Sequence, residues 1–148
     1  MKNITFQNRI SIQAPASDIY GYLLDPGNLP RLHPLIIGVK PLRSEGSAST
    51  RVEIQDKIML FGRIPFYKKY EASFTSIEEN RQLLLETFTS PGIHIRNTII
   101  LSEETNETRV EERVHIAVPA LFASFVLKQI QFSHVEMLKS LKRILESA

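Results

Sequence analysis

The sequence of 148 residues contains no cysteine, which excludes disulfide bonds, thiolate nucleophiles and cysteine-ligated zinc. It also lacks any run of about 18 continuous apolar residues, the length that a membrane-spanning helix needs. The first residues, Met1 to Thr5, have none of the apolar character of a secretory signal. We therefore expect a soluble, cytoplasmic protein without a transmembrane segment.

The sequence also has no large excess of either positive or negative charge. The 18 lysine and arginine residues exceed the 16 aspartate and glutamate residues by only two, and no basic run stands out, so nucleic acid is not an expected partner. The four histidines are not closely paired, so no metal site is predicted. There is no glycine-rich phosphate loop, nucleophile elbow or zinc-protease motif. No cofactor is predicted.

The composition is that of an ordinary globular chain, with 43% apolar and 23% charged residues. A chain of this length buries roughly two thirds of its unfolded surface on folding. No internal repeat or low-complexity segment divides it. We expect residues 1–148 to form a single domain.

Hydrophobic periodicity predicts β-structure flanked by helices. Apolar residues alternate in the first segment, and Pro15 then favours a short helix that ends at Asp25-Pro26-Gly27, with a second short helical piece after it. The turns that follow, which include Glu45-Gly46-Ser47, are too close together for crossover helices, so the sheet should be antiparallel. The alternating residues of the first segment are Ile4, Phe6, Ile10 and Ile12, and the later strands are predicted at 36–44, 49–60, 66–77, 81–89, 93–102 and 108–118.

One long amphipathic helix of roughly seven turns is predicted after Pro119. It is the only element large enough to cover one face of the sheet. Because a helix is only about 10 Å wide and the curved sheet is wider, we expect an apolar cavity between them. The predicted fold class is α+β: a seven-stranded curved antiparallel sheet wrapped around a long C-terminal helix, with two short helices after the first strand.

Several short motifs mark strand ends, turns and helix starts. They are Ile12–Tyr20, Asp25–Pro30, His33–Ile36, Glu107–Val110 and Leu138–Lys142. In these motifs the chain resembles the helix-grip proteins of the Bet v 1-like superfamily, also called START or SRPBCC, and within it the bacterial polyketide cyclase/dehydrase and lipid transport group. The resemblance covers essentially the whole chain. Because its motifs are structural, the resemblance implies the fold. It does not distinguish among the functions found in the superfamily, which include lipid carriers, receptors and aromatic cyclases.

Four polar residues interrupt apolar faces that should point inward: Asp56, Asn97 and Glu112 on three strands, and His134 on the final helix. Aligned apolar faces in the hairpin of the last two strands place Glu112 opposite Asn97 or one diagonal away. The four residues could orient a ligand's polar head, or act as an acid–base pair with His134 as the base. A purely structural interpretation stays open, in which Asp56 and Glu112 reach solvent near strand ends and His134 is a core histidine. The complete predicted cavity wall is Ile54, Asp56, Ile58, Asn97, Ile99, Glu112, Val114, Val126, Ile130, His134 and Leu138.

Apolar residues also lie on the outer side of the final helix. Leu121, Phe125 and Phe132 share a face there, and we call them the portal patch. One interpretation is that the loop Phe61–Phe66 covers them; the other is an exposed patch used for ligand uptake, homodimerisation or transient membrane contact. Three basic residues before the middle of the chain, Arg63, Lys68 and Lys69, are interpreted as part of a solvated face rather than as a basic rim. Among the remaining histidines, His33 is expected to pack under the short helices, and His94 and His115 to lie on the solvated face.

We therefore expect a carrier or sensor that binds a hydrophobic small molecule: a lipid, an isoprenoid or an aromatic compound. No residue is assigned as catalytic. The alternatives are an aromatase/cyclase-type enzyme that uses His134 and Glu112, and a protein-binding module of the same fold.

Overall fold

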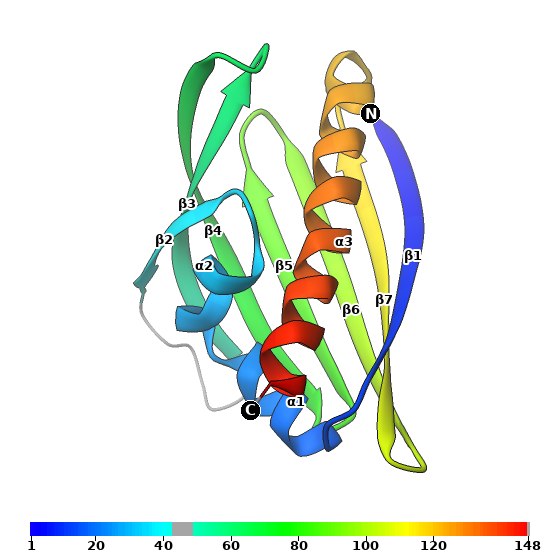
Figure 1. Ribbon diagram of the computed structural model, residues 1–148. Helices are drawn as coiled ribbons and strands as arrows, with labels where there is room; N and C mark the ends of the chain where they lie inside the picture. The colour runs from blue at the N-terminus through cyan, green and yellow to red at the C-terminus, as the bar shows by residue number, and fades with distance from the viewer. Residues whose placement is uncertain (43–48, 148) are drawn as a thin grey trace.

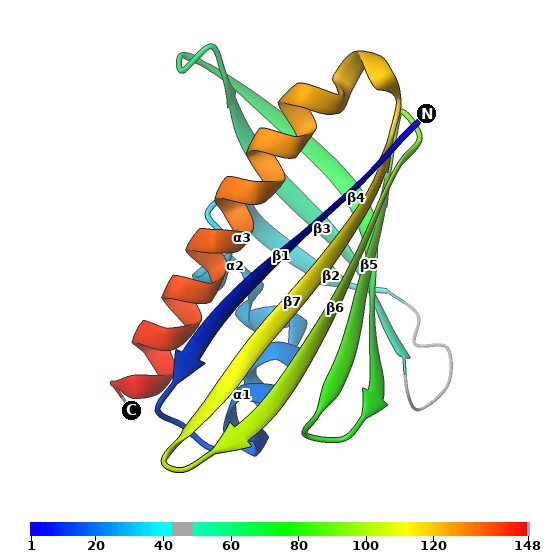
Figure 2. The ribbon, with the colours of Figure 1, turned by 90° about the vertical axis from the view of Figure 1, so that its right-hand side faces the viewer.

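A strongly curved antiparallel sheet wraps around one long helix in the computed structural model (Figures 1 and 2). The structure describes residues 1–42 and 49–147. Within them, seven strands form one sheet in the order β1-β7-β6-β5-β4-β3-β2. The strands are β1 (Lys2–Ile12), β2 (Ile36–Pro41), β3 (Ser49–Leu60), β4 (Ile64–Glu78), β5 (Gln82–Thr89), β6 (Ile93–Glu104) and β7 (Glu107–Val118). The helices are α1 (Ala16–Leu24), η1 (Pro26–Asn28), α2 (Leu29–Leu32), η2 (Ala120–Phe122) and α3 (Ala123–Glu146), of which η1 and η2 are single 3₁₀ turns.

The predicted elements are confirmed, with differences at their ends. β2 ends at Pro41, and the N–H of Leu42 still donates a hydrogen bond of 3.0 Å to the Arg51 carbonyl of β3. Residues 43–44 and the predicted turn Glu45-Gly46-Ser47 lie outside the described residues. β4 begins at Ile64, two residues earlier than predicted, because Phe61 and Gly62 take positive φ angles of 53° and 70° and close the hairpin tightly. Pro15 occupies the N-cap of α1, and α3 starts only after the η2 turn.

The C-terminal half of α3 is the packed end of the molecule. Met137, Leu138 and Leu141 are buried against residues of α1, which include Ile19 and Leu23. α1 is in turn attached to the sheet by a hydrogen bond between Tyr20 and Ser76. This end therefore closes one side of the space between helix and sheet.

The N-terminal half of α3 lies over one side of the sheet only. Its residues Val126 and Ile130 pack against a cluster built on β6 and β7, which contains Val114 and Ile116. α3 also lies along the edge strand β1, as Figure 2 shows. The helix thus covers the β1–β7 side.

α1 and α2 cover part of the inner faces of β3, β4 and β5, where Leu29 packs against residues such as Val52 and Phe74. The rest of those inner faces has no helix directly over it among the described residues, and it lines a cavity. No helix among the described residues is long and apolar enough to cross a membrane.

Candidate functional site

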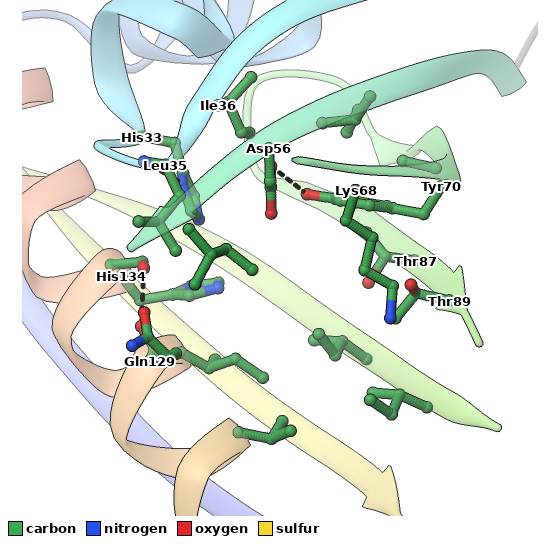
Figure 3. Close-up of a pocket in the computed structure, with 18 of the residues that line it drawn as sticks. His33, Leu35, Ile36, Asp56, Lys68, Tyr70, Thr87, Thr89, Gln129 and His134 are labelled. Carbon is green, nitrogen blue, oxygen red and sulfur yellow. Dashed lines mark hydrogen bonds between the residues drawn. The ribbon is translucent and has the colours of Figure 1, made fainter. Parts of the chain in front are cut away.

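A cavity of about 360 Å³ occupies the uncovered space between α3 and strands β3 to β6. From Phe125 to Met137 its wall follows α3, a length of roughly 18 Å at 1.5 Å per residue. The loop after α2 contributes His33 and Leu35, which Figure 3 shows beside Asp56. Most of the wall is apolar. Its polar side chains are His33, Asp56, Lys68, Tyr70, Thr87, Thr89, Asn97, Gln129, Ser133 and His134.

The predicted wall residues fall into two groups. Seven of them line the cavity: Ile54, Asp56, Ile58, Asn97, Val126, Ile130 and His134. The other four are buried elsewhere. Ile99 and Leu138 belong to the core beneath α1, Val114 is covered by α3, and Glu112 lies behind Asn97 and His134. Strand alternation identified the inner face, but it could not show that helices cover part of that face.

Glu112 is 0% exposed, and three side chains donate hydrogen bonds to its carboxylate. Asn8 Nδ2 lies 2.8 Å from Oε1, and Asn97 Nδ2 lies 2.9 Å from Oε2. His134 Nδ1 lies 3.0 Å from the same Oε2. The register of β6 and β7 pairs Asn97 with Val114, so Glu112 is one diagonal from Asn97. Glu112 does not reach solvent, and each of its two carboxylate oxygens accepts at least one side-chain hydrogen bond.

His134 links this network to the cavity. A carboxylate can only accept hydrogen bonds, so Nδ1 carries the proton that is donated to Glu112. No hydrogen bond to Nε2 occurs within residues 1–42 and 49–147, and the ring lines the cavity. A histidine whose Nδ1 is fixed by a buried carboxylate, with Nε2 left for a ligand, can exchange a proton with that ligand or hydrogen-bond it.

His33 lies at the C-terminal cap of α2, where its ring and that of His134 meet edge to face with centroids 6.1 Å apart. Burial lowers the His33 pKa from 6.5 to about 3, and the neighbouring His134 also acts to lower it. The His33 imidazole is therefore neutral at ordinary pH. It packs beneath the short helices and also faces the cavity.

Asp56 and Tyr70 form a second polar pair in the wall. The Tyr70 hydroxyl donates a hydrogen bond of 3.0 Å to Asp56 Oδ1 (Figure 3). Burial raises the pKa of Asp56 from 3.8 to about 6, although the Tyr70 hydrogen bond and the charge of Lys68 oppose the shift. Burial and the Asp56 carboxylate raise the pKa of Tyr70 well above its usual value of 10. Asp56 is only 8% exposed, so it does not reach solvent.

Sequence reasoning missed several polar wall residues, although the same alternation rule could have found them. Lys68 lies on the same face of β4 as Phe66, Ala72 and Phe74, so it points into the cavity and is not part of a solvated face. Its neighbour Lys69 lies on the opposite face and is exposed. Tyr70, Thr87 and Thr89 interrupt inward apolar runs on β4 and β5 in the same way. Asn8 does so on β1, where it hydrogen-bonds Glu112 and does not line the cavity.

The portal patch is exposed in the folded protein. Leu121, Phe125 and Phe132 of the portal patch are 87%, 48% and 58% exposed, so the loop Phe61–Phe66 does not cover them. Phe61 itself is 93% exposed at the tip of the β3–β4 hairpin. That tip and the start of α3 both extend at the same end of the molecule in Figures 1 and 2. Phe125 additionally lines the cavity, so the portal patch is continuous with its wall.

The remaining histidines lie on the outer face of the sheet. His94 Nε2 lies 2.9 Å from Glu86 Oε2, and its ring stacks on that of Phe88. His115 has the same outward parity. In the part of the chain that the structure describes, no group of three histidine, aspartate or glutamate side chains could hold a metal ion.

Comparison with known families settles the relationship of the chain. A family described as polyketide cyclase / dehydrase and lipid transport matches residues 3–146. The chain belongs to this family. The comparison with curated proteins finds no match.

Solved structures from the same superfamily have the same helix-grip fold. The Zhui aromatase/cyclase from Streptomyces sp. R1128 is 12% identical with a TM-score of 0.80, covering 98% of this chain and 94% of its own. A START superfamily protein from Mycobacterium smegmatis is 14% identical with a TM-score of 0.72, covering 97% of both chains. The di-domain aromatase/cyclase BexL from the BE-7585A biosynthetic pathway is 14% identical with a TM-score of 0.80. The match covers 97% of this chain but only 50% of BexL, so this chain spans about half of that protein's length. At these identities the likeness establishes the fold.

Proposed function

We propose that the protein binds a hydrophobic small molecule, such as a lipid, an isoprenoid or an aromatic compound, in the cavity between α3 and the sheet. The cavity carries this proposal, because its volume of about 360 Å³ and its mainly apolar wall are typical of small-molecule sites. A few polar side chains in an apolar wall orient a ligand without holding it by charge alone. The protein would then act as a carrier or sensor in the cytoplasm.

The portal patch is the proposed route into the cavity. Phe125 contributes both to the wall and to the exposed surface, so an apolar ligand that crosses the mouth there stays in contact with apolar side chains. Lys128 lies on α3 between Phe125 and Phe132 and is exposed. An apolar surface with a neighbouring cation suits brief contact with a membrane, and self-association through the patch is the competing use.

Filling the cavity tests the binding proposal. Ala72 is buried in the cavity wall on β4, and its neighbour Ser73 has the opposite parity and faces outward. Ala72→Phe should abolish displacement of Nile red by 1-dodecanol, while Ser73→Phe should leave it unchanged. Ala72→Leu, a smaller insertion, serves if the larger one impairs folding. Native mass spectrometry of the purified protein should show a small molecule that is lost in Ala72→Phe. Equal dye binding by Ala72→Phe and wild type would contradict the proposal.

An enzymatic function is the second candidate, and the Glu112–His134 hydrogen bond of 3.0 Å favours it. The buried carboxylate orients the ring, and Nε2 faces a site where a bound molecule could give up or accept a proton. Asp56, whose pKa is raised to about 6, is a second group that can change protonation near neutral pH. By likeness to the aromatase/cyclase structures and to the family description, the reaction would be the cyclisation or dehydration of a polyketide.

Replacing each of two histidines separates catalysis from binding. His134→Gln should lower the rate with a polyketide analogue by about 10²–10⁴-fold if His134 is the general base. His94→Gln removes a histidine from the outer face and should leave the rate unchanged. The rate of the wild-type protein should depend on pH, because the base must be unprotonated. A rate unaffected by His134→Gln, with Nile red binding intact, would leave the carrier function as the better account.

A further inference from the structure

Three polar side chains gather on the β4–β5 side of the cavity. Lys68 projects from an inward position of β4, and Thr87 and Thr89 project from inward positions of β5. Figure 3 shows the end of the Lys68 side chain beside the two threonines, turned away from Asp56. We call these residues the Lys68–Thr87–Thr89 group. They lie apart from the Glu112–His134 network, which belongs to β1, β6, β7 and α3.

Hydrogen-bonding capacity in this group is not used up. Lys68 Nζ donates to the backbone carbonyl of Ser90, and an ammonium has three donors. Within residues 1–42 and 49–147, no carboxylate lies within 4.0 Å of Nζ, although the β3–β4 register pairs Lys68 with Asp56. The hydroxyl oxygens of Thr87 and Thr89 are both buried, and neither has a hydrogen-bond partner in the part of the chain that the structure describes. Buried polar groups in folded proteins are nearly always satisfied, so these two hydroxyl groups beside the cavity need a partner such as a water molecule or a bound ligand.

The donors available are those that an anionic head group requires. A carboxylate accepts hydrogen bonds at two oxygens and pairs best with a charged donor. Lys68 supplies the charge, and the two threonine hydroxyls supply neutral donors next to it. The surrounding wall residues Phe66, Ile93 and Ile95 are apolar and suit the hydrocarbon part of the same molecule.

We propose that the Lys68–Thr87–Thr89 group binds the carboxylate of the hydrophobic ligand, so that the protein selects apolar carboxylic acids over the matching alcohols and esters. This inference rests on the proposed binding function and adds the chemical class of the ligand. Asp56 is the opposing charge on this wall. Its Oδ1 accepts the Tyr70 hydrogen bond, and the Lys68 ammonium is turned from it toward β5, so the ligand carboxylate meets the cation rather than Asp56.

A matched set of ligands and variants tests this selectivity. Dodecanoic acid, methyl dodecanoate and 1-dodecanol share one hydrocarbon chain, and their affinities can be compared by displacement of Nile red at about pH 8, where a carboxylic acid is ionised. Wild type should bind the acid at least roughly tenfold more tightly than the ester or the alcohol, the factor expected for a hydrogen bond to a charged group. Lys68→Met should lose that preference and still bind the ester as wild type does.

Lys69→Met is the matched control, since it removes the same charge one residue along β4 on the outer face. It should keep the full preference for the acid, and Lys68→Arg should keep most of it. Thr87→Val removes one hydroxyl with little change of shape and should reduce the preference without weakening binding of the ester. A thermal melt of each variant establishes that it folds.

The outcomes separate the two proposals. If all three ligands bind wild type equally, or if Lys68→Met and Lys69→Met keep the same preference for the acid, the carboxylate site is wrong and the binding function stands. If none of the three displaces Nile red and Ala72→Phe binds the dye as wild type does, both the binding function and the carboxylate site are wrong.

Discussion

The two halves of α3 continue one helix and one hydrophobic pattern, yet they differ in what surrounds them. In the C-terminal half, Met137, Leu138 and Leu141 are buried against α1 and the sheet. In the N-terminal half, Phe125 and Phe132 are exposed, and Val126 and Ile130 border a cavity. The same kind of side chain therefore contributes to a core at one end and to an accessible apolar surface at the other.

The difference follows from what covers the sheet. α1 and α2 fill the space at the C-terminal end of α3, and no helix among the described residues does so over β3 to β5 at the other end. Burial contributes to stability only where side chains are close-packed. We call the end around Met137–Leu141 of α3 the closed end, and the end around Phe125–Phe132 the open end. We therefore expect the closed end to determine the stability of the fold. The open end should determine ligand binding, at some cost in stability.

The largest effect is expected at the closed end. Leu141 is 0% exposed, so Leu141→Ala should lower the free energy of unfolding by about 2–5 kcal/mol, through lost burial and a residual cavity. The double variant Phe125→Ser/Phe132→Ser at the open end should change it by less than about 1 kcal/mol, because both side chains are already about half exposed. Urea unfolding measures both.

Uptake of Nile red should show the reverse order. The Phe125→Ser/Phe132→Ser protein should take up the dye more slowly than wild type, and Leu141→Ala should not, as long as it is folded. A double variant that loses several kcal/mol would mean that the two phenylalanines are part of the core and that the portal patch has no role in access.

A smaller effect is expected at Glu112, which lies between the two ends. Glu112→Gln replaces one carboxylate oxygen by an NH₂ group, so at least one of the three donors around it loses its acceptor. The free energy of unfolding should fall by about 2 kcal/mol, the cost of a buried unsatisfied group. Glu111→Gln, the adjacent change on the outer face, should stay within about 1 kcal/mol, because its partner Arg113 is exposed. Equal effects of the two changes would show that the network does not hold β1, β6, β7 and α3 together.

The smallest effect concerns Asp56 in the cavity wall, where a charge is kept at the expense of stability. Its pKa is raised from 3.8 to about 6 in the folded protein, so the folded state binds this proton more tightly than the unfolded state does. Below about pH 4 the carboxyl is neutral in both states, and above about pH 6 the folded state bears the full cost of the buried charge. Asp56→Asn does not titrate and can still accept the Tyr70 hydrogen bond.

The stability of Asp56→Asn should therefore equal that of wild type near pH 3.5 and exceed it by an amount of the order of 1–2 kcal/mol at pH 7 to 8. Urea unfolding across this range measures the difference. Taking the difference between the two proteins removes the contribution of His33, whose lowered pKa makes both less stable as the pH falls below 6.5. A constant difference at all pH values would mean that Asp56 ionises normally and is not buried in the folded protein.

The sequence predicted the elements of the fold well because each depends on local periodicity. Alternation on β3 to β7 and the long amphipathic pattern of α3 are properties of neighbouring residues, and the differences lie at ends such as Pro41 and Ile64. The site was predicted only in part. Side-chain alternation identified Asn97 and Glu112 as inward and as opposite each other or one diagonal apart, and the structure shows the diagonal arrangement. The prediction also placed Glu112 in the cavity wall, whereas the Asn97 amide and the His134 ring keep it behind that wall.

What the sequence determined by itself is which face of each strand and helix is apolar, since residue spacing fixes side-chain direction. It thereby determined that Asp56, Lys68 and His134 interrupt inward faces. Only the tertiary structure decided which of those positions meet a core and which meet an empty space. That outcome depends on α3 lying over β1 and β7 rather than over β4, a long-range arrangement that no local period contains. The same arrangement leaves Lys68 beside two threonines with unused hydrogen-bonding capacity, and gives each carboxylate oxygen of Glu112 at least one side-chain donor.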